Sequence, residues 1–293
     1  MKAVKAAAND VLGHASFAAR AENAPPLQQY SGRDGVPLSF RFYDSMNKDR
    51  VIFLLHGSSA HGEYLHSFAE YLSIHGAGQV VVPNLRGHYS SGGVRGDCAF
   101  IGQLEEDLYH FINTFDLEGK KIFLAGHSSG GGLALRYAAG PYGDEVAGLL
   151  LLSPVIPRAP TMRKGDGGGW AKVSVLRMAA FSFLNSLGIR WFNNCKVITF
   201  NKPPEFCDGR ETLSYSYNLY ASYHPRQPYD TDIAAIKCPF LLLIGSDDEV
   251  NDPLPFGRIF QRPSSIRILE GVKHLEITLN RSAMELAVNW MKG

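Results

Sequence analysis

The chain has 293 residues, a net charge of +1 and 45% hydrophobic residues. That length suits one large α/β domain or two small ones, and the near-neutral charge argues against a nucleic-acid partner, because neutralising phosphates needs a clear basic excess. The longest apolar stretches, residues 146–152 and 240–244, are far shorter than the roughly 20 residues that span a bilayer, so we expect no transmembrane segment.

The first 27 residues are too polar for a secretory signal. Such a signal needs an apolar region of about 7–15 residues, and polar or charged side chains interrupt this one (Asn9, Asp10, His14 and Arg20). We therefore expect a non-secreted, cytoplasmic protein. Pro25 and Pro26 close the segment, because the residue before a proline disfavours helix. Residues 1–27 are predicted to form an N-terminal arm.

The next part of the chain alternates short apolar runs with segments of helical periodicity. Residues 63–75 and 103–115 are predicted helices, and the second carries one apolar stripe (Leu104, Leu108, Phe111, Ile112 and Phe115). Buried strands that alternate with amphipathic helices are typical of a parallel sheet covered on both faces. We predict strands over residues 38–43, 51–55, 79–83, 121–125 and 147–153.

The alternation of strands and helices stops after residue 153 and resumes near residue 240. Residues 157–236 are rich in proline and contain an apolar helix around 173–187, whereas strands return at 240–244 and 266–269 before a final helix at 282–291. An insertion of about 80 residues in a regular α/β domain is better explained as a cap over the carboxyl edge of the sheet than as a linker. We therefore predict a core of residues 28–156 and 237–293 with a cap of residues 157–236.

Residues 121–133 predict a strand, a tight turn and a helix, with the pattern G-x-S-x-G at the turn. Ser128 sits at its centre, and the residues two before and two after it, Gly126 and Gly130, must be small because the turn is strained. The helix that follows directs its positive end at charge developing on a substrate. Ser128 is therefore the candidate nucleophile.

A serine nucleophile needs a base and an orienting carboxylate, which follow it along the chain in the order acid, then His. Only His224 and His274 follow Ser128, and only His274 also follows the strand at 240–244 and its acidic turn. We assign His274 as the base and expect His224 to be a cap residue. The acid comes from the turn after that strand, where three residues compete (Asp247, Asp248 and Glu249).

Acyl transfer also needs amide donors for the oxyanion. These come from the residue after the nucleophile, Ser129, and from the loop after an early strand, Ser58. In that loop we expect Gly57 to give the tight turn and His56 to brace the backbone rather than transfer protons. His61 and His66 lack the neighbouring ligands of a zinc site, so we expect neither metal nor cofactor. The cysteines show no CxxC pair, and a Cys195–Cys207 bridge stays open.

Together these motifs resemble the α/β-hydrolase superfamily, and within it the lysophospholipase and monoacylglycerol-lipase-like group of serine hydrolases, also described as serine aminopeptidase-like. The resemblance runs from about residue 34 to the end and weakens through the predicted cap. It implies an α/β-hydrolase fold with a helical cap. By the G-x-x-D and G-x-x-H turns of that family it places the acid at Asp248 and the base at His274, so that Asp247 and Glu249 would face solvent. The segments that carry it are L-H-G at 55–57, P-N-L-R-G-H at 83–88, G-H-S-S-G-G at 126–131, G-S-D-D at 245–248 and G-V-K-H at 271–274.

The expected activity is that of a lipase, esterase or lysophospholipase-like hydrolase, which cleaves a small-molecule carboxylic ester with a hydrophobic acyl group through a Ser-His-Asp triad and an acyl-enzyme. Aromatic side chains of the predicted cap either bind a hydrophobic acyl chain or form the core of the cap itself (Trp170, Phe181, Phe183, Trp191 and Phe192). One alternative is a peptidase or amidase with the same triad, for which Glu205, Asp208 and Glu211 would hold a free amine. Another is a binding protein without turnover. The sequence leaves a homodimer open.

Overall fold

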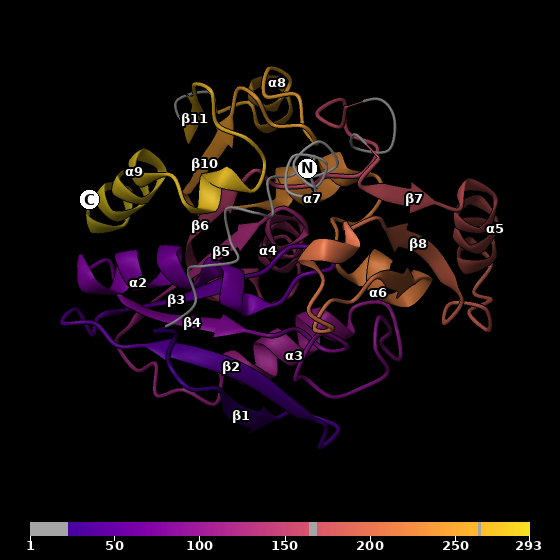
Figure 1. Ribbon diagram of the computed structural model, residues 1–293, viewed down its shortest axis with the longest axis horizontal. Coiled ribbons are helices and arrows are strands. Elements are labelled where there is room, and N and C mark those ends of the chain that lie inside the picture. Colours follow the sequence, from indigo (N-terminus) through magenta and orange to yellow (C-terminus); the bar gives the residue numbers. More distant parts are fainter. Residues whose placement is uncertain (1–22, 164–168, 263–264) are drawn as a thin grey trace.

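The computed structural model describes residues 23–163, 169–262 and 265–293, so residues 1–22 of the predicted arm lie outside it. At its centre is an eight-stranded sheet in the order β1-β2-β4-β3-β5-β6-β10-β11 (Figure 1). The strands from β4 to β11 run parallel, and β2 is antiparallel to both of its neighbours. The predicted mostly parallel sheet is confirmed. The strands are β1 (Gln28–Ser31), β2 (Pro37–Tyr43), β3 (Arg50–Leu55), β4 (Gln79–Pro83), β5 (Lys121–His127), β6 (Val146–Leu152), β10 (Phe240–Gly245) and β11 (Ile266–Leu269).

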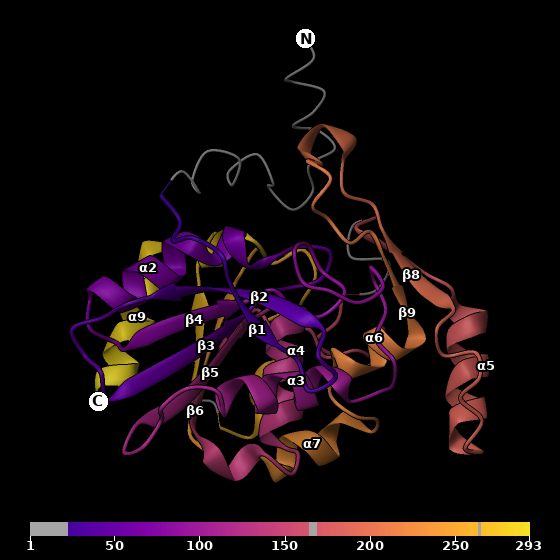
Figure 2. The ribbon, with the colours of Figure 1, turned by 90° about the horizontal axis from the view of Figure 1, so that it is seen from below.

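Helices cover both faces of the sheet, which explains why its inner strands β3, β4, β6 and β10 are apolar at nearly every position. Successive side chains of a strand point to opposite faces, and in β3 Phe53 packs into one hydrophobic cluster while Ile52 and Leu54 pack into the other. Figure 2 shows the two helical layers on either side of the sheet. The first layer contains α3 (Gln103–Ile112) and α4 (Ser129–Ala138), and the second contains α2 (His66–Ile74) and α9 (Arg281–Lys292).

The described part of residues 157–236 contains a second, smaller sheet and three α-helices. This three-stranded antiparallel sheet has the order β7-β8-β9, and β8 and α5 stand beside the core (Figure 2). The helix predicted around 173–187 is α5, but the three strands were not expected, because strands of three to five residues are too short to show a period. The elements are β7 (Ala171–Val173), α5 (Val175–Ser186), β8 (Lys196–Phe200), η4 (Pro204–Phe206), β9 (Ser214–Ser216), α6 (Tyr217–Ser222) and α7 (Tyr229–Ala235).

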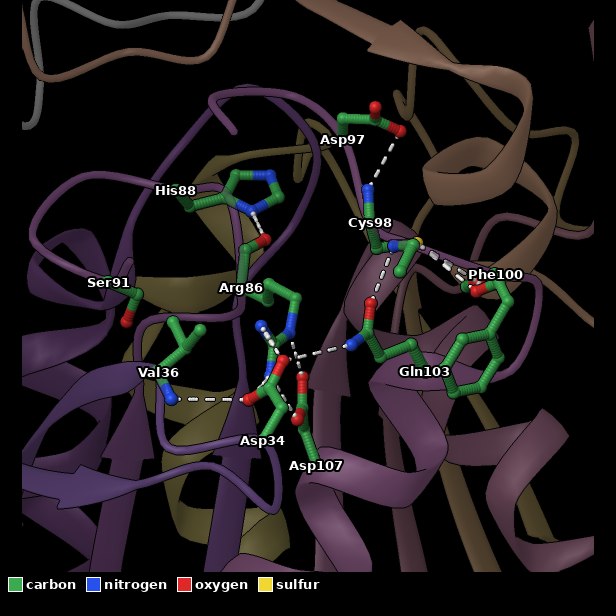
Figure 3. A network of polar contacts seen from close by, with 12 residues as sticks. Asp34, Val36, Arg86, His88, Ser91, Asp97, Cys98, Phe100, Gln103 and Asp107 are labelled. Carbon is green, nitrogen blue, oxygen red and sulfur yellow. Dashed lines mark hydrogen bonds and ion pairs between the residues drawn. The ribbon is translucent and has the colours of Figure 1, made fainter. Parts of the chain in front are cut away.

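A buried arginine anchors the loop that follows β4 to the core (Figure 3). The Arg86 guanidinium donates to both carboxylate oxygens of Asp107 on α3, each at 2.7 Å, and to both oxygens of Asp34 at 2.9 and 3.0 Å. Such bidentate pairs fix orientation as well as charge. The loop is thereby held against β3, where the Leu85 amide donates to His56. His56 is the first residue after β3, so this hydrogen bond links the loop after β4 to the candidate site.

Candidate active site

Ser128 occupies the turn between β5 and α4, with a backbone φ of 57° that residues other than glycine rarely adopt. Close backbone approach explains the glycines on either side. A Cβ on Gly126 would lie 2.3 Å from the carbonyl oxygen of Gly130, and a Cβ on Gly130 would lie 2.3 Å from that of Leu55. Only a residue without a side chain fits at either position. The turn therefore projects the Ser128 hydroxyl from the carboxyl edge of the sheet.

The structure brings Ser128, His274 and Asp248 together. His274 Nε2 lies 2.9 Å from Ser128 Oγ, and His274 Nδ1 lies 2.9 and 3.0 Å from the two oxygens of Asp248. A carboxylate only accepts hydrogen bonds, so Nδ1 carries the proton and Nε2 is free to accept from the Ser128 hydroxyl. This is the tautomer that a general base needs.

Asp248 is fully buried yet stays ionised. Burial raises the pKa of its carboxyl, but the charge and hydrogen bond of His274 and the amide of Asn251 outweigh burial and hold that pKa below its ordinary value. The other two acids of this turn were expected to face solvent, and one of them does not. Asp247 is exposed, as expected, whereas Glu249 is half-buried and accepts the backbone N–H of His274 at 2.9 Å. Glu249 therefore holds the backbone of the histidine loop.

The loop of residues 56–59, which follows β3, lies against the nucleophile. A Cβ on Gly57 would come within 3.0 Å of Ser128 Cβ. His56 is buried, and burial holds its pKa well below the ordinary value, so its ring is neutral. Its Nε2 accepts from the Leu85 amide at 3.1 Å, and its Nδ1 donates to the Gly57 carbonyl at 2.9 Å. The ring thus spends both nitrogens on backbone groups and has none left for proton transfer.

Ser58 and Ser129 meet through their side chains. Their hydroxyl oxygens are 2.6 Å apart, and Ser129 Oγ lies 3.1 Å from Nε2 of His224. His224 Nδ1 donates to the carbonyl of Tyr220, so its Nε2 accepts from Ser129, and Ser129 in turn accepts from Ser58. Burial lowers the pKa of His224 to about 4 and keeps the ring neutral. His224, predicted to be a cap residue, thus orients the hydroxyls of the two serines beside Ser128.

A tyrosine to which the sequence analysis assigned no role connects the loop of residues 56–59 to His274. Tyr64 accepts the Gly57 amide at 2.8 Å and donates to His127 Nδ1 at 2.7 Å. His127, the residue before the nucleophile, donates from Nε2 to the carbonyl of His274 at 3.0 Å. Tyr64 stands in the segment after the H-G motif, but no spacing rule in the sequence points to its partners.

Two further tyrosines reach the same loop from the insertion. Tyr215 accepts the Ser59 amide at 2.6 Å and donates to His88 Nε2 at 2.6 Å. Tyr223 donates to the His56 carbonyl at 2.8 Å. Both phenols are buried, and burial raises their pKa values. The insertion therefore helps to shape the loop beside the nucleophile, over separations of more than 150 residues that no local pattern encodes.

Ser128 and His274 line a cavity of about 370 Å³ between the core and residues 202–211 of the insertion. Apolar side chains contribute part of its wall (Ala60, Trp170, Phe206, Leu275 and Leu279). The five aromatic residues singled out in the sequence do not share one role. Trp170 lines the cavity, Phe181 packs on Phe192 and Tyr217 within the insertion, and Phe183 and Trp191 are exposed. The five residues therefore neither all line a cavity for an acyl chain nor all form the core of the insertion.

Charged residues line the mouth of the cavity, and most of them are paired. Arg210 donates to Glu63 at 2.7 Å and to Asp208 at 2.6 Å, which ties the insertion to the core. Glu211 is paired with Lys202. Glu205 also lines the cavity and has no ion pair among the residues that the structure describes. All three acids considered for binding a free amine therefore lie at this cavity.

In the described part of the chain no three His, Cys, Asp or Glu side chains gather as a metal site would require. All four cysteines are free, so Cys195 and Cys207 are not bridged. Within the same ranges no helix is both long enough and apolar enough to pass through a membrane.

A family model, curated proteins and solved structures all match this chain. The family model described as serine aminopeptidase, S33, matches residues 46–277. Monoglyceride lipase of Saccharomyces cerevisiae is 24% identical over 89% of this chain and 90% of its own length, and monoglyceride lipase of Rattus norvegicus is 26% identical over 79% and 77%. Among solved structures, a soluble variant of the S. cerevisiae enzyme with a substrate analogue superimposes with a TM-score of 0.71 at 18% identity, covering 94% of this chain and 96% of that one. The monoacylglycerol lipase of Paleococcus ferrophilus gives 0.64 at 22% identity, over 87% and 98%.

Proposed function

The chain belongs to the serine aminopeptidase S33 family and has the α/β-hydrolase fold, and from that premise we propose that it is a carboxylic ester hydrolase of the lipase or esterase type. The observation that carries the proposal is His274, which accepts from Ser128 on one nitrogen and donates to Asp248 on the other. Three of the curated relatives are monoglyceride lipases. The hydrogen-bonded geometry supports acyl transfer, and the relatives favour an ester as the substrate.

In the proposed mechanism Ser128 Oγ attacks the ester carbonyl while its proton passes to His274 Nε2. The buried Asp248 carboxylate stabilises the imidazolium that forms. The amides of Ser58 and Ser129 donate to the oxyanion of the tetrahedral intermediate. His274 then returns the proton to the departing alcohol, and the acyl group stays on Ser128.

Deacylation reverses these roles with water in place of the alcohol. His274 takes a proton from the water, whose oxygen attacks the acyl carbonyl, and the carboxylic acid leaves as Ser128 regains its proton. Residues 157–236 act as a cap in this scheme, because residues 202–211 form the outer wall of the cavity that contains Ser128. The side chains of Trp170, Leu275 and Leu279 supply apolar surface for an acyl chain. A cytoplasmic location and a homodimer stay predictions.

Ser128→Ala tests the proposal directly. We expect turnover of p-nitrophenyl butyrate to fall by roughly 10⁶-fold, because the nucleophile is lost, and a fluorophosphonate probe to label the wild type at Ser128 only. Ser67→Ala is the matched control, since Ser67 lines the same cavity and has no part in the mechanism. Undiminished turnover in Ser128→Ala, or labelling at another residue, would contradict the proposal. A probe that labels nothing would favour the binding-protein alternative.

A second candidate function is an aminopeptidase, and the acidic mouth of the cavity favours it. Glu205 lines the cavity without an ion pair among the described residues, and a free carboxylate there would attract the ammonium of a peptide N-terminus. Comparing turnover of p-nitrophenyl esters with that of aminoacyl naphthylamides separates the two functions. We expect the esters to be preferred in kcat/KM, and a preference for the naphthylamides that disappears in Glu205→Gln would establish the aminopeptidase.

A further inference from the structure

A second cavity lies beside His224. It has a volume of about 310 Å³ and is lined mainly by α5, α6 and the loops around residues 157–158 and 224–227. Among the residues that the structure describes, none lines both cavities. His224 forms part of its wall, and its Nε2 accepts from Ser129, the residue that follows Ser128.

Three arginines line this second cavity, and among the described residues no carboxylate does. Arg136 and Arg226 share the buried Glu105 carboxylate behind the wall, and Arg226 also pairs with Asp232. Arg158 has no ion pair in the part of the chain that the structure describes. Three guanidinium groups therefore face two carboxylates, and one positive charge is left without a partner.

The arginine donors are only partly used. Arg136 is buried and spends Nε and Nη1 on Glu105 and on the carbonyls of Ala221 and His224. Its Nη2 has no acceptor among the described residues. Arg158 lies close enough to Tyr220 for its charge to lower the pKa of that phenol, against the larger effect of burial. Unused guanidinium N–H groups on adjacent walls are the donors that a carboxylate accepts most strongly.

The rest of the lining is apolar or weakly polar. Ile101, Met178 and Ala221 contribute hydrocarbon surface, two prolines close the loops, and Tyr217 spends its hydroxyl on Ser182. A cavity with cationic donors and hydrocarbon walls suits an amphipathic anion. A small inorganic anion would satisfy the arginines but leave the apolar wall without a contact.

We propose that the second cavity binds an aliphatic monocarboxylate, with the carboxylate on the free donors of Arg158 and Arg136 and the hydrocarbon chain against Met178. His224 is not a ligand in this site, because both of its ring nitrogens are already engaged. The site is therefore distinct from any binding of the acid product beside Ser128. The inference does not depend on the proposed esterase activity.

Isothermal titration calorimetry with sodium octanoate tests this site on protein whose Ser128 has first been capped by diisopropyl fluorophosphate, so that the catalytic cavity is blocked. Should Ser128 not react, the esterase proposal fails by itself and the titration is run on the uncapped protein. We expect one octanoate per chain. Octylamine, which carries the opposite charge, and inorganic phosphate, which lacks the hydrocarbon chain, should each bind at least tenfold more weakly.

Variants locate the binding. Arg158→Gln should weaken octanoate binding about tenfold, because it removes a charged hydrogen-bond donor at an exposed position that folding does not need. Arg190→Gln is the matched control, an exposed arginine of the insertion that lines neither cavity, and its affinity should equal that of the wild type. Ala221→Phe should fill the cavity and abolish binding, with circular dichroism to verify folding. Equal affinity in Arg158→Gln and Arg190→Gln, an absence of octanoate binding, or tighter binding of phosphate would each overturn the proposal.

Discussion

The interior of the core and the outer surface of the insertion differ in which side chains they bury. The core buries His56, His88 and His127, each with both ring nitrogens hydrogen-bonded. The insertion leaves Leu176 and Trp191 86% and 87% exposed. Buried polar groups are costly unless every donor and acceptor is satisfied. The contrast indicates that the geometry beside Ser128 is set by a buried polar network, whereas the outer surface of the insertion leaves it unaffected.

Asp248→Asn is the strongest test of the core side of this contrast. An asparagine that presents its NH₂ to His274 would favour the tautomer with a bare Nδ1 and a protonated Nε2, which cannot accept the Ser128 proton. We expect kcat on a p-nitrophenyl ester to fall by about 10⁴-fold with little change in folding. Asp247→Asn, one residue away and exposed, is the matched control, and an equal loss in both variants would disprove the assignment of the acid.

Acid should unfold the protein through its buried histidines. Burial lowers the pKa of His88 to about 4 and that of His127 to about 3, and it holds the pKa of His56 well below its ordinary value. Between about pH 6.5 and pH 4 the unfolded chain therefore binds protons that the folded chain does not, so the free energy of unfolding falls as the pH falls.

Well below pH 6.5 the free energy of unfolding falls with a limiting slope of about 1.4 kcal/mol per pH unit for each such histidine, and His224, with its pKa lowered to about 4, adds to these three. Urea denaturation at pH 7.5, 6.5 and 5.5 measures this slope. The lowered pKa of Asp248 acts in the same direction, but only below its ordinary value. An unfolding free energy that stays constant from pH 6.5 to pH 5.5 would mean that the folded core accepts these protons.

Arg86→Met should destabilise the core by about 3–5 kcal/mol, because it leaves the buried Asp107 without its partner. The measurement is urea denaturation at pH 7. Arg33→Met is the control, since Arg33 is exposed and only 3.9 Å from Glu106, and an exposed pair at that distance contributes little. A loss below 1 kcal/mol in Arg86→Met would show that the network of Figure 3 does not anchor the loop after β4.

Tyr64→Phe should reduce kcat by roughly 10- to 100-fold, because the Gly57 amide and His127 Nδ1 lose their shared partner at a cost of about 1–3 kcal/mol. These two groups adjoin the proposed oxyanion loop and the His274 backbone, so the loss should appear in kcat rather than KM. Tyr109→Phe is the control, a tyrosine on α3 that stacks on Tyr142 away from the site. Equal kcat in Tyr64→Phe and Tyr109→Phe would exclude a positioning role for Tyr64.

Local patterns made much of the core predictable. The strands at residues 79–83 and 266–269 have the predicted bounds, because a run of β-branched and aliphatic residues between turn residues is a strand signal. Ser128 could be found for the same reason, since its two glycines and the strand before it lie within ten residues. Asp248 needed the family resemblance, because three acids in one turn satisfy the same local rule.

The contacts from the insertion could not be predicted. Tyr215 and Tyr223 bond to residues more than 150 positions away, and which tyrosine of many reaches the loop depends on how a three-stranded sheet of very short strands packs. The aromatic residues of the insertion illustrate the same limit. Their number in the sequence does not distinguish a wall of the cavity from an exposed surface, since both accept large apolar side chains.

Two tryptophans of the insertion offer the finest test of the contrast between the regions. Trp191→Ser removes an exposed ring that lines neither cavity, so the free energy of unfolding should change by no more than about 0.5 kcal/mol and KM for p-nitrophenyl octanoate should stay constant. Trp170→Ser removes a ring that lines the cavity containing Ser128 and packs near Phe200. KM for p-nitrophenyl octanoate should therefore rise more than KM for p-nitrophenyl acetate. A rise of KM for these esters in Trp191→Ser would mean that the outer surface of the insertion contributes to substrate binding. The contrast between a core that forms the site and an outer surface that takes no part in it would then be wrong.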